Sequence, residues 1–192
     1  AFGVVHPDRD TMELILHNAF AAPFMETHPE LLTDILNLYP ITRSPLDTLA
    51  DIMGDTFFFC GGLQYSALWA KVAPTWHYIF SYTPEAATQD YRAFHAIELP
   101  YIFGIPGGPP LWSTNFSDSE KAITGHIMTY FLNFAKSGSP NSPDPVQVAW
   151  PSYDTKKSME FGEGGSVDVV YQVRNERCRF WNENFPHGLP QK

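Results

Sequence analysis

The chain has 192 residues, of which 44% are hydrophobic and 15% aromatic, and it carries a formal net charge of −9. This length suffices for one domain with a substantial core. The acidic balance, with no Lys/Arg cluster longer than Lys156-Lys157, argues against nucleic acid as a partner. No segment approaches the roughly 20 apolar residues that a membrane-spanning helix needs.

The first third of the chain predicts a series of helices. Thr27 and Glu30 have the spacing of a capping box, and the leucine-rich helix behind them is expected to end at Pro40. Ser44-Pro45 is typical of the start of another helix. The predicted helices cover residues 10–20, 27–39, 44–53 and 57–72, the last one mostly buried and carrying Cys60.

The remaining elements mix strands with helices. Aromatic and β-branched residues alternate over Trp76–Tyr82, which predicts a strand. A loop over residues 84–92 and a short helix over 97–103 follow, and Ser117 with Glu120 forms a second capping-box pattern. The later predicted elements are a helix over 117–135, strands over 157–161 and 166–170, and a helix over 173–184.

This alternation predicts an α/β layer architecture. A doubly wound sheet needs several parallel, nearly all-apolar strands, and this chain offers only two or three. We therefore expect mostly helices with a few strands that complete a sheet shared with another chain.

The compartment is indicated by two cysteines, Cys60 and Cys178, and by one glycosylation sequon, Asn115-Phe116-Ser117. Two cysteines taken alone are equally consistent with buried free thiols, and a single sequon is common by chance. Together they favour secretion. The chain begins at Ala1 without a methionine or a basic leader, and we interpret it as processed or internal to a longer precursor.

Several classes of site leave no motif in the sequence. The seven histidines are scattered, no His-Glu-x-x-His or Cys–His cluster occurs, and a metal site is not expected. No Gly-x-Ser-x-Gly elbow is present, so the chain has no recognisable nucleophile of its own. No P-loop or Gly-x-Gly-x-x-Gly follows a predicted strand, and we expect no cofactor.

His95 is the strongest candidate for chemistry because of its position. It lies in a loop after a predicted strand, follows Phe94, and precedes Glu98 by three residues. A histidine held there suits a general base that titrates near neutrality. The alternative is a partly buried histidine whose ring bonds a backbone carbonyl.

The segment Phe94–Gly104 resembles the histidine motif of the type-B carboxylesterase/cholinesterase-like family, within the α/β-hydrolase superfamily. Further segments match the landmarks of that family in the same order along nearly the whole chain: Met53-Gly54-Asp55, Pro74–Phe80, Tyr130–Asn141, Trp150–Tyr153 and Cys178–Phe185. The resemblance implies that residues 1–192 are the C-terminal portion of a single carboxylesterase-like α/β-hydrolase domain.

The resemblance also assigns roles to residues. His95 would be the triad base, and Glu98 would match a buried glutamate linked to the site through hydrogen bonds, with a solvated helix carboxylate as the alternative. Ala96 stands where many members have glycine. Cys60 and Cys178 would form a disulfide of the secreted members.

The nucleophilic serine would come from a complementary N-terminal chain. The triad acid is expected just before Ala1, and a second alignment makes Asp8 the acid. The implied reaction is hydrolysis of a small ester or a lipid without a cofactor. The family also implies an alternative, a catalytically inactive cholinesterase-like binding or adhesion module.

Overall fold

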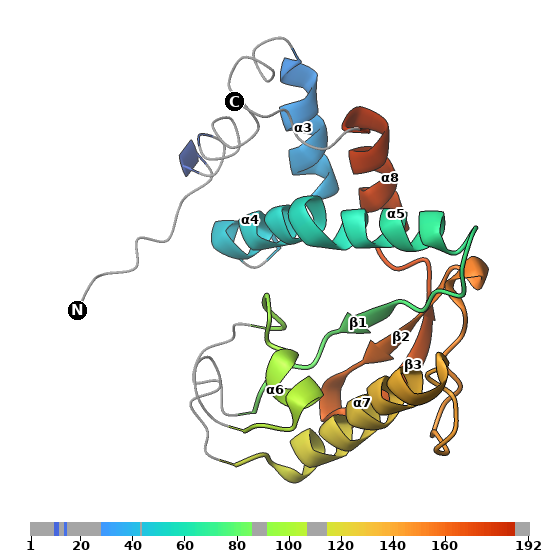
Figure 1. Ribbon diagram of the computed structural model, residues 1–192. Coiled ribbons are helices and arrows are strands. Elements are labelled where there is room, and N and C mark those ends of the chain that lie inside the picture. Colours follow the sequence, from blue (N-terminus) through green and yellow to red (C-terminus); the bar gives the residue numbers. More distant parts are fainter. Residues whose placement is uncertain are drawn as a thin grey trace. The chain divides into compact units, whose positions relative to one another are not determined.

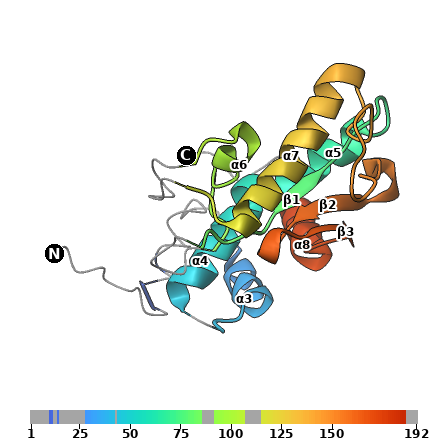
Figure 2. The same cartoon turned by 90° about the horizontal axis from the view of Figure 1, so that it is seen from below.

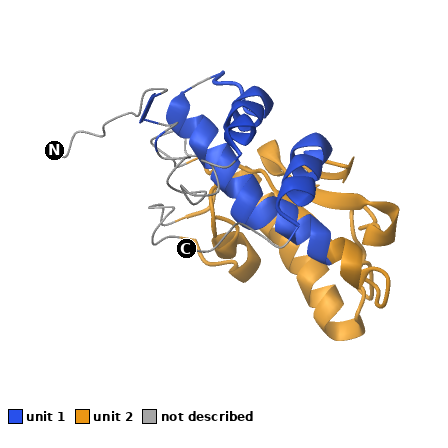
Figure 3. Ribbon diagram, turned by 90° about the horizontal axis from the view of Figure 1, so that it is seen from above, with its two compact units in different colours: residues 1–65, 174–192 blue, residues 66–173 orange. Residues whose placement is uncertain are grey.

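The computed structural model describes residues 10–11, 14, 28–42, 44–85, 92–106 and 115–186. The helix expected over residues 10–20 therefore lies outside the described residues, except for helical Asp10, Thr11 and Leu14. The chain forms two compact units, residues 1–65 with 174–192 (unit 1) and residues 66–173 (unit 2), which Figure 3 colours separately. That residues 1–192 belong to a single domain stays a prediction.

Unit 1 is helical. Its leucine, isoleucine and aromatic residues pack around a disulfide to form one core, which includes Ile35, Ile52 and Trp181. Helices α3 and α8 run side by side in it (Figure 1). The elements are α3 (Pro29–Leu38), α4 (Pro45–Gly54), the π-helix η1 (Asp55–Phe59), α5 (Cys60–Trp69), which continues into unit 2, and α8 (Asn175–Asn184).

The starts of α3 and α4 differ from each other. Ser44 caps α4 as expected, because its hydroxyl oxygen accepts the Asp47 N–H at 3.1 Å. The N-cap of α3 is His28, which makes no side-chain cap bond, and Thr27, where the capping box was expected to begin, lies outside the described residues. Pro29 fixes this boundary, since proline suits the first helical position, where its missing N–H is not needed.

A buried carboxylate organises the centre of unit 1. Asp55 has a fully buried side chain that pairs with the guanidinium groups of Arg174 and, at 3.5 Å, Arg177. The Tyr39 hydroxyl donates to Asp55 at 2.8 Å and accepts the Trp181 indole N–H at 2.7 Å. Burial raises the pKa of Tyr39 above its ordinary value. The network therefore satisfies a charge that would be costly to bury alone.

Cys60 and Cys178 form a disulfide, which confirms the pairing implied by the resemblance. Their Cα atoms are 5.0 Å apart, and the two residues are 118 positions apart in sequence. Both cysteines lie within the unit 1 core. The bond thus ties the start of α5 to α8.

The single buried helix expected over residues 57–72 is wrong in two respects. A π-helical turn precedes α5, and α5 ends at Trp69. The segment also exposes large apolar side chains, with Phe57 52% and Trp69 59% accessible. An apolar sequence indicates that a helix packs against other residues, but it does not show whether those residues belong to the same chain.

Unit 2 contains a mixed three-stranded sheet with the order β1-β2-β3. Strand β1 (Tyr78–Phe80) is parallel to β2 (Lys157–Phe161), with Ile79 opposite Glu160, and β2 is antiparallel to β3 (Val167–Tyr171). The expected strand over Trp76–Tyr82 is therefore confirmed in a shorter form. The described residues form mostly helices with few strands, which confirms that part of the predicted fold class.

Two helices and two short 3₁₀ turns complete unit 2. Helix α7 (Asp118–Ser137) lies along one face of the sheet, and α6 (Leu99–Phe103) packs beside α7 (Figures 1 and 2). The predicted capping box at Ser117 and Glu120 is present. The 3₁₀ turns are η2 (Tyr153–Thr155) and η3 (Glu163–Gly165). No described helix is long and apolar enough to cross a membrane.

The core of unit 2 is aromatic. The Trp150 ring meets those of Tyr78, Tyr130 and Phe161 edge-on, with centroids 5.5–6.2 Å apart. Such edge-to-face pairs are favourable beyond the area that they bury. The core thereby fixes the sheet against α7.

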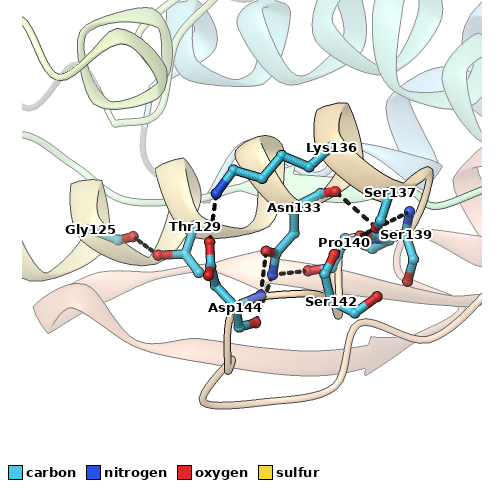
Figure 4. A network of polar contacts seen from close by, with 9 residues as sticks. All are labelled: Gly125, Thr129, Asn133, Lys136, Ser137, Ser139, Pro140, Ser142 and Asp144. Carbon is cyan, nitrogen blue, oxygen red and sulfur yellow. Dashed lines mark hydrogen bonds and ion pairs between the residues drawn. The ribbon is translucent and has the colours of Figure 1, made fainter.

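A buried amide fastens the loop after α7 (Figure 4). The Asn133 side chain donates to the carbonyl oxygens of Pro140 and Asp144 at 3.0 and 2.9 Å, and it accepts the Asp144 N–H at 2.9 Å. Asn141 bonds both backbone groups of Trp150, its carbonyl oxygen at 2.9 Å and its N–H at 2.7 Å. The two amides therefore hold the loop after α7 at both Asp144 and Trp150.

Candidate active site

His95 lies in a tight turn at the C-terminal side of β1. The Ile97 N–H donates to the Phe94 carbonyl at 3.1 Å and closes the turn, which makes His95 its second residue. His95 is exposed. Ile97 is 1% accessible and packs in the unit 2 core, and Phe94 is half-buried against the same core. The imidazole is therefore accessible on a backbone that is held at both ends.

Ala96, the third residue of the turn, has φ of +66°. A type II turn requires a positive φ at this position, which is why glycine is usual there. The Ala96 carbonyl accepts the Leu99 N–H at 3.3 Å, so the turn leads directly into α6. Ala96 therefore occupies a backbone position that favours glycine.

Glu98 is the residue that precedes α6 and is half-buried. Its carbonyl accepts the N–H groups of Tyr101 and Ile102, both at 3.0 Å. Burial raises the pKa of Tyr78 on β1, and the nearby negative charge of Glu98 adds to the rise. The Glu98 carboxylate therefore lies close enough to Tyr78 to influence the pKa of its hydroxyl. A hydrogen-bonded link from Glu98 to His95 stays a prediction.

A second carboxylate, Glu120, lies beneath α6 and is 3% accessible. It accepts the Tyr101 hydroxyl at 3.1 Å and the Ser117 N–H at 2.8 Å. Burial, reinforced by the charge of Glu120, raises the pKa values of Tyr82 and Tyr101. The sequence predicted the cap contact of Glu120 but not the bond to Tyr101, because no spacing along the chain joins α6 to α7 there.

The positions expected to complete a triad lie outside the described residues. Both positions considered for the acid, before Ala1 and at Asp8, lie outside them. The sequence has no Gly-x-Ser-x-Gly elbow. In the described ranges, no group of three or more His, Cys, Asp or Glu side chains could hold a metal ion. The described part of the chain thus presents His95 as an accessible candidate base, and the sequence offers no nucleophile motif.

Asn115, the acceptor of the sequon, is exposed just before α7. Each of the next two residues has a structural role. Phe116 stacks on Tyr101 with ring centroids 5.3 Å apart, and the Ser117 hydroxyl accepts the Glu120 N–H at 3.2 Å. Accessibility permits glycosylation, which stays a prediction.

Comparison with known proteins places these features in a family. A family model described as the carboxylesterase family matches residues 10–181. Carboxylesterase 5A of Mus musculus is 28% identical over 202 residues, covering 96% of this chain and 34% of that protein. Neuroligin-2 of Homo sapiens is 31% identical over 132 residues, covering 60% of this chain and 16% of that protein.

Solved structures show the same fold. A structure of PNB esterase matches with a TM-score of 0.63 and 24% sequence identity, covering 94% of this chain and 34% of the other. Another PNB esterase structure matches with a TM-score of 0.66 and 23% identity. The chain therefore has the fold of a portion of that esterase. It spans about a third of the length of carboxylesterase 5A and of the esterase structure, and a smaller share of neuroligin-2.

Proposed function

Because this chain belongs to the carboxylesterase family, we propose that it supplies the histidine base, His95, of a serine-histidine-acid esterase. The observation that carries the proposal is the accessible imidazole on a turn whose flanking residues are anchored in the core. The serine, the oxyanion-hole amides and the triad acid come from a complementary N-terminal polypeptide. The substrate is a small ester or a lipid, and no cofactor is needed.

The chemistry follows from what an imidazole can do. His95 accepts the proton of the serine hydroxyl as its oxygen bonds the ester carbonyl carbon, and it returns that proton to the departing alcohol oxygen. Water then attacks the acyl-serine in the same way and releases the carboxylic acid. The triad acid holds the other ring nitrogen in its protonated form. Glu98, which is half-buried just after the turn, is linked to the site through hydrogen bonds.

Two features support a companion polypeptide that completes the domain. Strand β1 pairs with β2 on one side, and no described strand pairs with its other side, so a parallel strand can be added there. Leu68, Trp69 and Val72 expose 53%, 59% and 76% of their surface at and just after the end of α5, a helix without any charged residue. An exposed apolar patch of this kind is typical of an obligate interface.

Secretion is proposed from the disulfide and the accessible sequon together. Digestion of the native protein with an N-glycosidase should lower its mass, and Asn115→Gln should abolish the shift. An unchanged mass in protein from a secreting host would remove glycosylation from the proposal.

The catalytic assignment is tested with the complete protein, this chain assembled with its companion. His95→Ala should lower the rate of p-nitrophenyl ester hydrolysis by about 10⁴-fold while the thermal unfolding temperature stays the same. His126→Ala, which changes a half-buried histidine of α7, is the matched control and should retain the rate. A loss of only a few-fold in His95→Ala would mean that another base acts.

The rival function, an inactive binding or adhesion module, differs at the nucleophile. A fluorophosphonate probe should label the companion polypeptide and leave this chain unlabelled. If the companion has another residue in place of the serine and takes no label, the binding module is the correct function.

A further inference from the structure

The turn that carries His95 is built on a backbone conformation that alanine rarely adopts. Only five described non-glycine residues have a positive φ: Arg92, Ala96, Lys156, Gln172 and Arg174. Ala96 is the one that is covalently next to the candidate base. A left-handed backbone brings the Cβ atom of an L-residue close to its own carbonyl oxygen, so the surroundings must hold the residue there.

Those surroundings are the hydrogen bonds and the core contacts of the turn. The Phe94 carbonyl and the Ile97 N–H close it at 3.1 Å, and the Leu99 N–H bonds the Ala96 carbonyl at 3.3 Å. Ile97 is almost fully buried, so the turn cannot relax by shifting its C-terminal side. Strain of this kind persists where the surrounding structure over-determines it, and it is concentrated at functional sites.

We infer that Ala96 is a positioning residue, whose left-handed backbone sets the direction in which His95 leaves the turn; this rests on the proposed catalytic role of His95. A change of Ala96 to an extended or right-handed conformation would rotate the His95 peptide plane while Phe94 and Ile97 stay in place. The imidazole would then be displaced from its reactive partner. A displacement of about 1 Å costs on the order of 100-fold in rate.

The inference predicts which side chains position 96 accepts. Glycine and asparagine adopt the left-handed region readily, whereas leucine does not. Asparagine and leucine have nearly the same size and the same branching at Cγ, so they separate backbone conformation from volume. We therefore expect Ala96→Gly and Ala96→Asn to keep kcat within about threefold, and Ala96→Leu to lower kcat about 100-fold with KM within about twofold.

Lys156 supplies the matched control. It has φ of +56° after η2 and is exposed, away from the His95 turn in sequence. Lys156→Leu should lower the thermal unfolding temperature of the complete protein without changing kcat. A purely structural role for Ala96 would make Ala96→Leu behave as Lys156→Leu does.

The experiment measures kcat, KM and thermal unfolding for all variants in the assembled protein. Equal kcat values for Ala96→Leu and Ala96→Asn would overturn the inference. If Ala96→Leu does not fold, Ala96→Thr takes its place, because a β-branched residue rarely adopts the left-handed region, and its kcat is expected at no more than about a third of the glycine variant's. Equal threonine and glycine variants would also overturn the inference. A fully active His95→Ala would instead refute the proposed function.

Discussion

Unit 1 and unit 2 stabilise their cores by different means. In unit 1, a disulfide and a buried carboxylate join residues far apart in sequence: Cys60 to Cys178 over 118 positions, and Asp55 to Arg174 over 119. In unit 2, aromatic packing and buried amides join a sheet, a long helix and a fastened loop. The candidate base belongs to unit 2. Unit 1 therefore depends on a few cross-links, and unit 2 on many packed contacts.

The largest expected effect is removal of the disulfide. Replacing Cys60 and Cys178 by alanine should lower the free energy of unfolding by about 4 kcal/mol, because a loop of 118 positions is released in the unfolded chain. Denaturant unfolding of the complete protein measures the loss. Hydrogen exchange should accelerate in α8 and stay unchanged in α7. Equal acceleration in both helices would refute the contrast between the units.

Removal of the buried Asp55 carboxylate should have the second largest effect on stability. Asp55→Ala should lower the free energy of unfolding by about 3 kcal/mol, since two guanidinium groups and the Tyr39 hydroxyl lose their partner. Asp118→Ala is the matched control, because Asp118 pairs with Lys121 on an exposed helix turn, and it should leave the unfolding midpoint unchanged. Similar midpoints for the two variants would mean that the Asp55 network contributes little.

The corresponding test in unit 2 is Asn133→Ala. This change removes three hydrogen bonds to backbone groups of the loop after α7 and should cost about 2 kcal/mol. Hydrogen exchange of the Asp144 N–H reports the loosened loop. Lys136→Ala, which removes a half-exposed ion pair to the same Asp144, is the control and should have little effect. If the two variants match, the loop is held by packing instead.

A smaller effect should appear as pH falls. Burial lowers the pKa of His77 to about 4, and its Nδ1 lies 2.9 Å from the Ser158 hydroxyl oxygen. The unfolded chain binds this proton more readily, so stability is full above pH ~6.5 and is lost as pH falls towards 4. The loss should reach about 2 kcal/mol between pH 7 and pH 5. His77→Gln should flatten this part of the stability profile, and an unaltered profile would mean that other groups cause it.

Local signals predicted much of this structure. Ser117 with Glu120 predicted the start of α7, and the strand over Lys157–Phe161 was predicted with its exact bounds. The resemblance paired Cys60 with Cys178. These features depend on residues close together in the sequence or on a pattern shared with a family. Both kinds of signal are present in the sequence alone.

Other features depend on distant groups. The left-handed backbone at Ala96 could not be predicted from an alanine, because that residue normally favours other regions. The bond between Tyr101 and Glu120 joins two helices whose approach no spacing reveals. The apolar residues of α5 were expected to be buried, but several are exposed. An apolar pattern predicts burial without identifying the residues that would cover the helix.

Ser117 caps α7 with its hydroxyl and is also the third position of the Asn115 sequon. Oligosaccharide transfer to Asn115 requires a serine or threonine at this place, and the first turn of α7 requires the same side chain to accept the Glu120 N–H. Selection for the helix alone would preserve the hydroxyl at position 117 but not Asn115, so in relatives that never meet the glycosylation machinery the serine should persist while the asparagine varies. Of the conservative replacements, only threonine keeps both the cap and the acceptor signature.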